Sequence, residues 1–181
     1  MRVVSVNVGA AAPLAWEGRV IRTGIRKRPV TGRVPIREGH LLGDEQADPR
    51  VHGGPLKALY AYPSEHYAFW RTELGPAALP WGAFGENLTT EGWLETEVRV
   101  GERVRIGTAE LVVTQPRGPC VKINAAFGRA DMIDRFRRAR RTGFYLGVER
   151  AGGLAAGDPI ELLDRPADGA TVYALSGAED R

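Results

Sequence analysis

The residue with the most distinctive chemistry in this sequence is its single cysteine, Cys120. It ends the segment Pro116-Arg117-Gly118-Pro119-Cys120, in which two prolines and a glycine exclude regular structure and favour a rigid loop. Arg117 and Lys122 flank the thiol, and neighbouring cations lower a thiol pKa and favour the thiolate. A thiolate attacks electrophiles or binds soft metals, whereas an isolated free cysteine is most often a small buried residue. The neighbours of Cys120 therefore favour a reactive or metal-bound sulfur and leave the choice between the two open.

A second candidate site surrounds His52, in the stretch Asp48-Pro49-Arg50-Val51-His52-Gly53-Gly54-Pro55. Paired glycines let a ligand approach closely, the imidazole titrates near neutral pH, and Asp48 can orient it or share its proton. The same residue types also form ordinary turns. We therefore treat His52 and Asp48 as candidates whose role the spacing alone leaves open.

Two polar blocks offer hydrogen-bond donors to an anion. Thr23-Gly24-Ile25-Arg26-Lys27 combines a hydroxyl, a flexible backbone and cations, and residues 85–90 add amide and hydroxyl groups. A solvated basic loop or a capped turn has the same composition. No Walker A motif or GxGxxG fingerprint occurs, so the sequence gives no support for nucleotide hydrolysis or a Rossmann site. The arginines from Arg135 to Arg141 indicate a solvated helix face, and without a recognised nucleic-acid module we expect no nucleic-acid partner.

The elements that must position these groups are short and mostly strands. Alternating valines predict a first strand at 4–8, and residues 96–115 predict a meander of three strands that leads into the Cys120 loop. Apolar spacing predicts helices at 64–74 and 130–141, and closing strands are expected at 144–148 and 160–163. The polar tail after residue 165 is expected to pack loosely.

Composition limits the class of protein. A chain of 181 residues with 43% hydrophobic content suits one domain, and 23 glycines and 12 prolines favour a β-rich body. One cysteine excludes an internal disulfide, a protein-held iron–sulfur cluster and a CxxC zinc site. The opening MRVVSVNVGA is too polar for a secretory signal, and no stretch approaches the roughly 20 apolar residues of a membrane helix. We therefore expect a cytoplasmic protein without a membrane partner.

Five blocks of this sequence, in order along the chain, are Thr23-Gly24-Ile25-x-Lys27, Gly43-Asp44-x-Gln46-Ala47-Asp48, His52-Gly53-Gly54 with Lys57-Ala58, Gly85-Glu86-Asn87-Leu88-Thr89, and Gln115-Pro116-Arg117-x-Pro119-Cys120-x-Lys122. Taken together, and in this order, they resemble the stand-alone bacterial MOSC proteins, and in particular the 6-N-hydroxylaminopurine resistance type. The resemblance extends over residues 1–164, which we expect to form the MOSC domain, with 165–181 as a C-terminal tail.

The resemblance implies a mainly β fold, a β-barrel of the MOSC and pyruvate kinase barrel type with a few short helices. It also implies a molybdenum cofactor, with Cys120 as the metal ligand. The residues that the resemblance makes candidate cofactor contacts are Lys27, Lys57, Asn87, Thr89 and Arg117, and it puts His52 and Asp48 near the open face of the metal as catalytic residues.

The activity implied is reductive removal of oxygen from N-hydroxylated bases, as a detoxification, with electrons from a separate, flavin-containing reductase. Three departures from the family pattern bear on the substrate: Leu56 stands where an aspartate is usual, Gly147 stands where an arginine is usual, and we expect no helical C-terminal extension. Two rival functions remain. One is a molybdenum-cofactor or sulfur carrier without substrate turnover, and the other is a metal-free hydrolase or transferase that uses Cys120 with His52.

Overall fold

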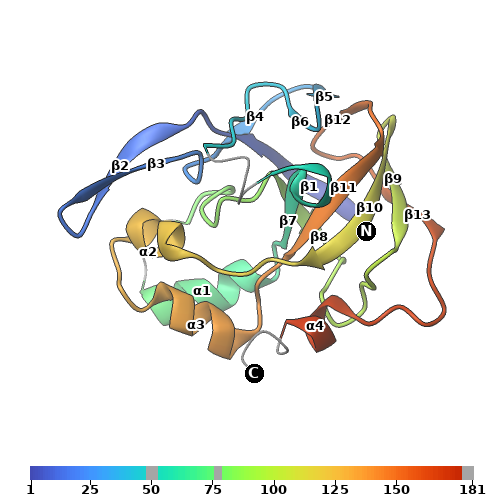
Figure 1. Ribbon diagram of the computed structural model, residues 1–181. Helices are drawn as coiled ribbons and strands as arrows, with labels where there is room; N and C mark the ends of the chain where they lie inside the picture. Colours follow the sequence, from blue (N-terminus) through green and yellow to red (C-terminus); the bar gives the residue numbers. More distant parts are fainter. Residues whose placement is uncertain (48–52, 76–78, 177–181) are drawn as a thin grey trace.

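The computed structural model describes residues 1–47, 53–75 and 79–176 (Figure 1). Its body is an eight-stranded sheet in which all neighbouring strands are antiparallel except the parallel pair β7 and β8. In spatial order the strands are β13 (Ile160–Asp164), β9 (Arg103–Ile106), β10 (Ala109–Pro116), β11 (Phe144–Arg150), β7 (Leu59–Pro63), β8 (Leu88–Glu91), β1 (Arg2–Val8) and β4 (Arg28–Val30).

The sheet curves back on itself. Backbone hydrogen bonds join β1 to the segment that leads into β13, from Val3 N to Asp158 O at 2.9 Å and from Ile160 N to Met1 O at 3.0 Å. The remaining strands form two smaller sheets. They are the hairpin of β2 (Ala12–Trp16) and β3 (Arg19–Thr23), and the group of β12 (Gly153–Leu154), β5 (Val34–Arg37) and β6 (His40–Leu41). The mainly β class with few helices is confirmed.

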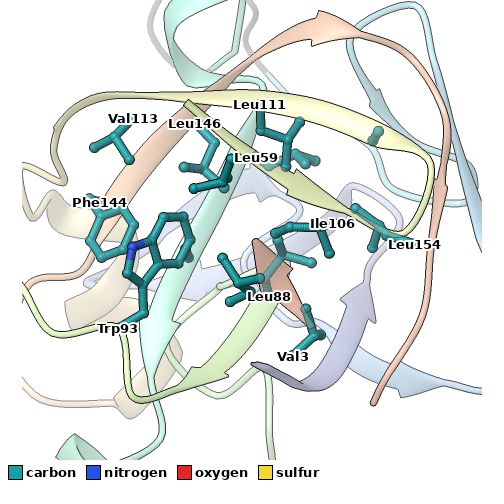
Figure 2. Close-up of a cluster of buried hydrophobic side chains, with 14 of the residues drawn as sticks. Val3, Leu59, Leu88, Trp93, Ile106, Leu111, Val113, Phe144, Leu146 and Leu154 are labelled. Atoms are coloured by element: carbon teal, nitrogen blue, oxygen red, sulfur yellow. The ribbon is translucent and has the colours of Figure 1, made fainter. Parts of the chain in front are cut away.

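The concave side of the sheet holds an aliphatic core, in which Trp93 and Phe144 meet edge to face at 4.7 Å between ring centroids (Figure 2). Period-two alternation supplies it: in β10 Leu111 and Val113 point inward while their neighbours are partly exposed. Burial of these side chains stabilises the fold by about 1.5–3 kcal/mol for each large apolar residue.

A second, aromatic cluster lies where helices cover the sheet. It is built from α1 (His66–Leu74), α2 (Val121–Phe127) and α3 (Met132–Ala139), which gather on one side of the molecule in Figure 1. Trp70 of α1 and Phe136 of α3 stack at 4.7 Å. Strand β7 separates the two clusters, because Leu59 and Ala61 face the aliphatic core while Tyr60 and Tyr62 face the aromatic one.

Several predicted elements are confirmed: the first strand, the helices near 64–74 and 130–141, and the two closing strands. The three-stranded meander is wrong. Only β9 and β10 form, because Val98 N bonds to Leu94 O in a turn and Val100 N bonds to Ala170 O. The alternation of Val98 and Val100 reflects the burial of Val98 and not a strand.

Several other elements were not expected from the sequence, among them strands β7 and β8. Helix α2 begins directly after Cys120, and the tail contains a short helix, α4 (Val172–Leu175), whose Val172 is fully buried in the aliphatic core. The expectation of a loosely packed tail is therefore wrong as far as residue 176. No helix in the described part of the chain is both long and apolar enough to cross a membrane.

Candidate functional site

The polar blocks singled out in the sequence converge on one pocket of about 100 Å³. Its lining comes from residues within 23–27, 44–47, 53–60, 85–87 and 117–122, and from Tyr145 of β11. Tyr60 of β7 contributes to the lining, so the pocket lies where the sheet meets the helical layer. Segments more than a hundred residues apart in the chain thus form a single site.

Cys120 lines this pocket from the junction between β10 and α2. Pro116 ends β10, residues 117–120 form the predicted loop, and Cys120 takes the N-cap position of α2 in extended conformation. The loop is held at its base by a hydrogen bond from Arg117 N to Gly143 O at 3.2 Å. The thiol group is half-buried, and a half-buried sulfur can meet both a metal and solvent-delivered substrate.

Arg117 brings a buried positive charge to the pocket. Its guanidinium lies 5.1 Å from the ring centroid of Tyr60 and 5.6 Å from that of Phe136, and the residue is 6% exposed. One of its nitrogens, Nη1, is buried and has no hydrogen-bond partner among the described residues. A buried cation with an unpaired donor is costly unless an anion completes it, so this side chain fits a negatively charged ligand.

Lys27 lies beside a carboxylate that sequence reasoning did not assign to the site. Its ammonium group donates to Asp44, which also accepts from Asn87 Nδ2 at 2.9 Å and from Gly9 N at 2.9 Å. Burial lowers the pKa of Lys27, against the opposing effect of Asp44. Lys27 and Asn87 therefore face the pocket as parts of one hydrogen-bonded cluster centred on Asp44.

Lys57 enters from the 3-10 turn η1 (Pro55–Lys57), with its Nζ 5.9 Å from the ring centroid of Tyr145. Tyr145 and Tyr60 lie 5.6 Å apart, and the Tyr60 hydroxyl donates to Thr142 O at 2.7 Å. Burial raises the pKa of both phenols, so they stay neutral at physiological pH and can only donate or accept hydrogen bonds. With Lys122, the pocket wall carries four basic side chains around the thiol.

Of the remaining predicted residues, the structure describes only Thr89. Thr89 is fully buried outside the pocket lining, where its hydroxyl donates to Glu86 at 2.9 Å and accepts from Asn7 Nδ2 at 3.1 Å. It shapes the strand behind Asn87 instead of facing the pocket. His52 and Asp48 lie outside the described residues. Within the described part of the chain, no cluster of three or more His, Cys, Asp or Glu could hold a metal ion, so a metal at Cys120 needs ligands from elsewhere.

Sequence reasoning missed three of the residues that line the pocket closely. Asp44 had a signal, since it belongs to the block Gly43-Asp44-x-Gln46, but no role followed from its type. Tyr60 and Tyr145 had none, because an aromatic residue in a strand usually indicates ordinary core packing. Leu56 is exposed, and neither it nor Gly147 lines the pocket.

Comparison with known proteins adds to this geometry. The model of the MOSC domain family matches residues 48–161. This chain is a MOSC protein. It is 42% identical over 170 residues to the uncharacterized protein YflK of Bacillus subtilis, which covers 94% of this chain and 76% of the relative. It is also 40% identical over 148 residues to the protein YiiM of Escherichia coli, covering 81% of this chain and 66% of that one.

A solved structure and a longer relative extend the comparison of this MOSC protein. The crystal structure of YiiM from Geobacillus stearothermophilus superposes with a TM-score of 0.79 at 31% identity, over 98% of this chain and 83% of that one. A protein of Gibberella moniliformis named "Reductase" is 36% identical over 152 residues, which are 82% of this chain and only 27% of the relative. The resemblance read from the five sequence blocks is confirmed at the level of the family.

Proposed function

We propose that this protein binds the molybdenum cofactor in the pocket at Cys120 and reduces N-hydroxylated bases or related N-hydroxylated compounds. One observation carries the proposal: the thiol shares its pocket with Lys27, Lys57 and Arg117, and a buried nitrogen of Arg117 lacks a partner among the described residues. MOSC domains are associated with this cofactor, which brings a phosphate and a pair of sulfur ligands. A pocket wall with three cations and a thiol fits an anionic group that supplies further ligands to a metal.

Each side chain has a defined share in the proposed activity. The Cys120 thiolate is a soft ligand, and Arg117, Lys27 and Lys57 neutralise and orient the anionic group, with Asn87 as a further hydrogen-bonding contact. When bound, the cofactor supplies a two-electron metal centre that can accept oxygen from an N-hydroxyl group. Reduction to the amine and water also consumes two protons for each two electrons. We assign their delivery to His52 and Asp48, which belong to the glycine-rich block beside Gly53 of the pocket.

We propose that the electrons come from a second protein, a flavin-containing reductase in the cytoplasm. The sequence of this chain has one cysteine and no Rossmann fingerprint, so it offers neither an iron–sulfur cluster nor a dinucleotide site. A segment similar to this chain also occurs within a longer fungal protein whose name is "Reductase". That occurrence supports the pairing of a MOSC domain with a source of electrons.

The test uses protein produced in a host that makes the cofactor. Molybdenum content and reduction of a panel of N-hydroxylated bases with an artificial electron donor are measured for the wild type and Cys120→Ala. We expect stoichiometric molybdenum and turnover in the wild type, and turnover reduced at least about a hundredfold in the variant with unchanged thermal unfolding, because a half-buried loop thiol contributes little core area. Molybdenum without turnover would indicate a carrier. Full turnover without metal would indicate a hydrolase or transferase that uses Cys120 as nucleophile.

A further inference from the structure

The turn that carries Lys57 rests on β11 at a position where only glycine fits. A Cβ atom at Gly147 would lie 2.8 Å from Pro55 O, 3.1 Å from Val112 Cγ1 and 3.3 Å from Thr114 Cγ2. Gly147 is not among the glycines with positive φ, so its backbone conformation is open to any residue. The requirement for glycine therefore comes from close packing: the tightest contact is with the backbone of turn η1, and the Val112 and Thr114 side chains of β10 add to it.

A second contact fixes the turn to β10. Thr114 Oγ1 lies 2.5 Å from Leu56 O and 3.1 Å from Tyr145 O, so its hydroxyl can donate to the carbonyl group directly before Lys57. Thr114 and Gly147 face the turn from neighbouring strands, because β10 and β11 pair antiparallel with Val112 opposite Gly147. The two residues form a seat under η1, and we call them the turn seat.

Burial of its own side chains does not hold the turn in place. None of the three residues of η1 is buried, and Leu56 is 61% exposed. Hydrophobic packing therefore contributes little to the position of the turn. Buried Ala58 and strand β7 fix the end of the turn that follows Lys57, and the turn seat fixes the side of the turn at Pro55 and Leu56. The turn seat therefore contributes to where the ammonium group of Lys57 reaches the pocket beside Tyr145.

We propose that Gly147 and Thr114 are positioning residues that hold turn η1 so that Lys57 meets the anionic ligand of the pocket. This inference rests on the proposed function, since it takes Lys57 as a contact of the molybdenum cofactor. An arginine at position 147, which the family resemblance led us to expect, has no room here unless the turn moves. Because Gly147 has no side chain, turn η1 can lie close to β11, and in this position Lys57 lines the pocket.

The test is a double-mutant cycle on the cofactor-loaded protein, with loss of molybdenum during dialysis as the readout. We expect Lys57→Ala to speed this loss about tenfold, since a charge-assisted contact to an anion is removed. Gly147→Ala and Thr114→Val should each speed it severalfold, and Thr114→Ser, which keeps the hydroxyl, should restore the wild-type rate. In the Lys57→Ala background, Gly147→Ala and Thr114→Val should add nothing.

Gly169→Ala is the matched control. Its Cβ would lie 2.9 Å from Val100 O, a comparable overlap with a backbone carbonyl, and 3.3 Å from Arg99 and Pro166. None of these three residues lines the pocket. We expect it to destabilise the fold without changing molybdenum retention. If Gly147→Ala and Thr114→Val keep their full effect without Lys57, or have no effect while Lys57→Ala does, the positioning role is overturned and the proposed function stands. A wild-type protein that takes up no molybdenum overturns both.

Discussion

At the scale of single residues, the pocket is distinguished by charges that the protein itself leaves incompletely balanced. Lys27 has Asp44, but Arg117 has aromatic rings and no ion pair with any described carboxylate. A structural arginine at this depth normally has its donors satisfied, because each unsatisfied buried donor costs about 1–3 kcal/mol. The cost is understandable where a ligand supplies the missing acceptor. We therefore expect substitutions at the two cations to have different effects on stability.

Replacement of Arg117 by Met should leave the unfolding free energy of the cofactor-free protein within about 1 kcal/mol of wild type, or raise it. The reason is that the substitution removes a buried charge and an unpaired donor while it keeps much of the contact with Tyr60 and Phe136. Urea unfolding and molybdenum content are the measurements. We expect little bound molybdenum in the variant. A large loss of stability would mean that Arg117 is a structural residue.

In contrast to Arg117→Met, Asp44→Asn should lower the unfolding free energy strongly. It leaves the buried ammonium group of Lys27 without its counter-charge, so the unfolding free energy should fall by about 3 kcal/mol at neutral pH. It also removes an effect that raises the pKa of Lys27, which burial already lowers from 10.5. At pH values between the lowered pKa of Lys27 in the folded protein and 10.5, Lys27 is protonated in the unfolded chain and largely neutral in the folded one. Because the unfolded state then binds one proton more, the stability of the variant should rise with pH in this range. Urea unfolding at several pH values tests this, and Lys27→Met/Asp44→Asn should abolish the dependence.

At the scale of elements, the arginines in α3 and directly after it have a different role from the solvated face that we expected. Arg135 binds Glu73 of α1 at 3.0 Å, Arg141 contacts His66 Nδ1 at 3.0 Å, and Arg140 lies 3.8 Å from the ring centroid of Tyr173 in α4. These contacts connect α3 to the helices on either side of it. The run of positive charge is therefore largely structural, which agrees with the expectation of no nucleic-acid partner without testing it.

Arg140→Ala should release α4 from α3. Arg140 has φ 51°, where alanine and arginine carry a similar backbone cost, so the substitution removes only the side-chain contacts to Tyr173. We expect faster hydrogen exchange in residues 172–176 and a loss of about 1 kcal/mol in unfolding free energy. Hydrogen-exchange mass spectrometry checks it. Arg138→Ala, at an exposed position of the same helix, is the control, and equal exchange in both variants would contradict the prediction.

The elements with a strong apolar period, such as β1, α1 and α3, were predictable because one face of each is buried. Helix α2 was not, since its first residue follows a proline-rich loop that masks the start of a helix. The site was predictable as a set of blocks, and Cys120, Lys27, Lys57, Asn87 and Arg117 do share one pocket. What the sequence could not give was orientation: Thr89 lies in the same block as Asn87 but faces Glu86, and the contact of Gly147 with Pro55 joins residues far apart in the chain.

At the scale of the whole molecule, the described residues form two hydrophobic clusters, separated by β7, of which only one borders the pocket. The aliphatic cluster inside the sheet has no residue in the pocket lining, whereas the aromatic cluster contributes Ile25 and Tyr60, with Tyr145 packed against it. Because a packed core transmits a change in shape to its immediate neighbours, the same loss of volume should have different functional effects in the two clusters.

Phe144→Leu and Phe136→Leu make that comparison. Both rings are fully buried, and each substitution should cost about 1–3 kcal/mol of unfolding free energy. Phe144 packs on Trp93 in the aliphatic cluster, while Phe136 stacks on Trp70 and supports the Arg117 guanidinium. We therefore expect Phe136→Leu to speed loss of molybdenum from the loaded protein severalfold and Phe144→Leu to leave it unchanged at matched stability. Equal rates of loss in the two variants would show that cofactor retention follows global stability, and that the aromatic layer has no special role in holding Arg117.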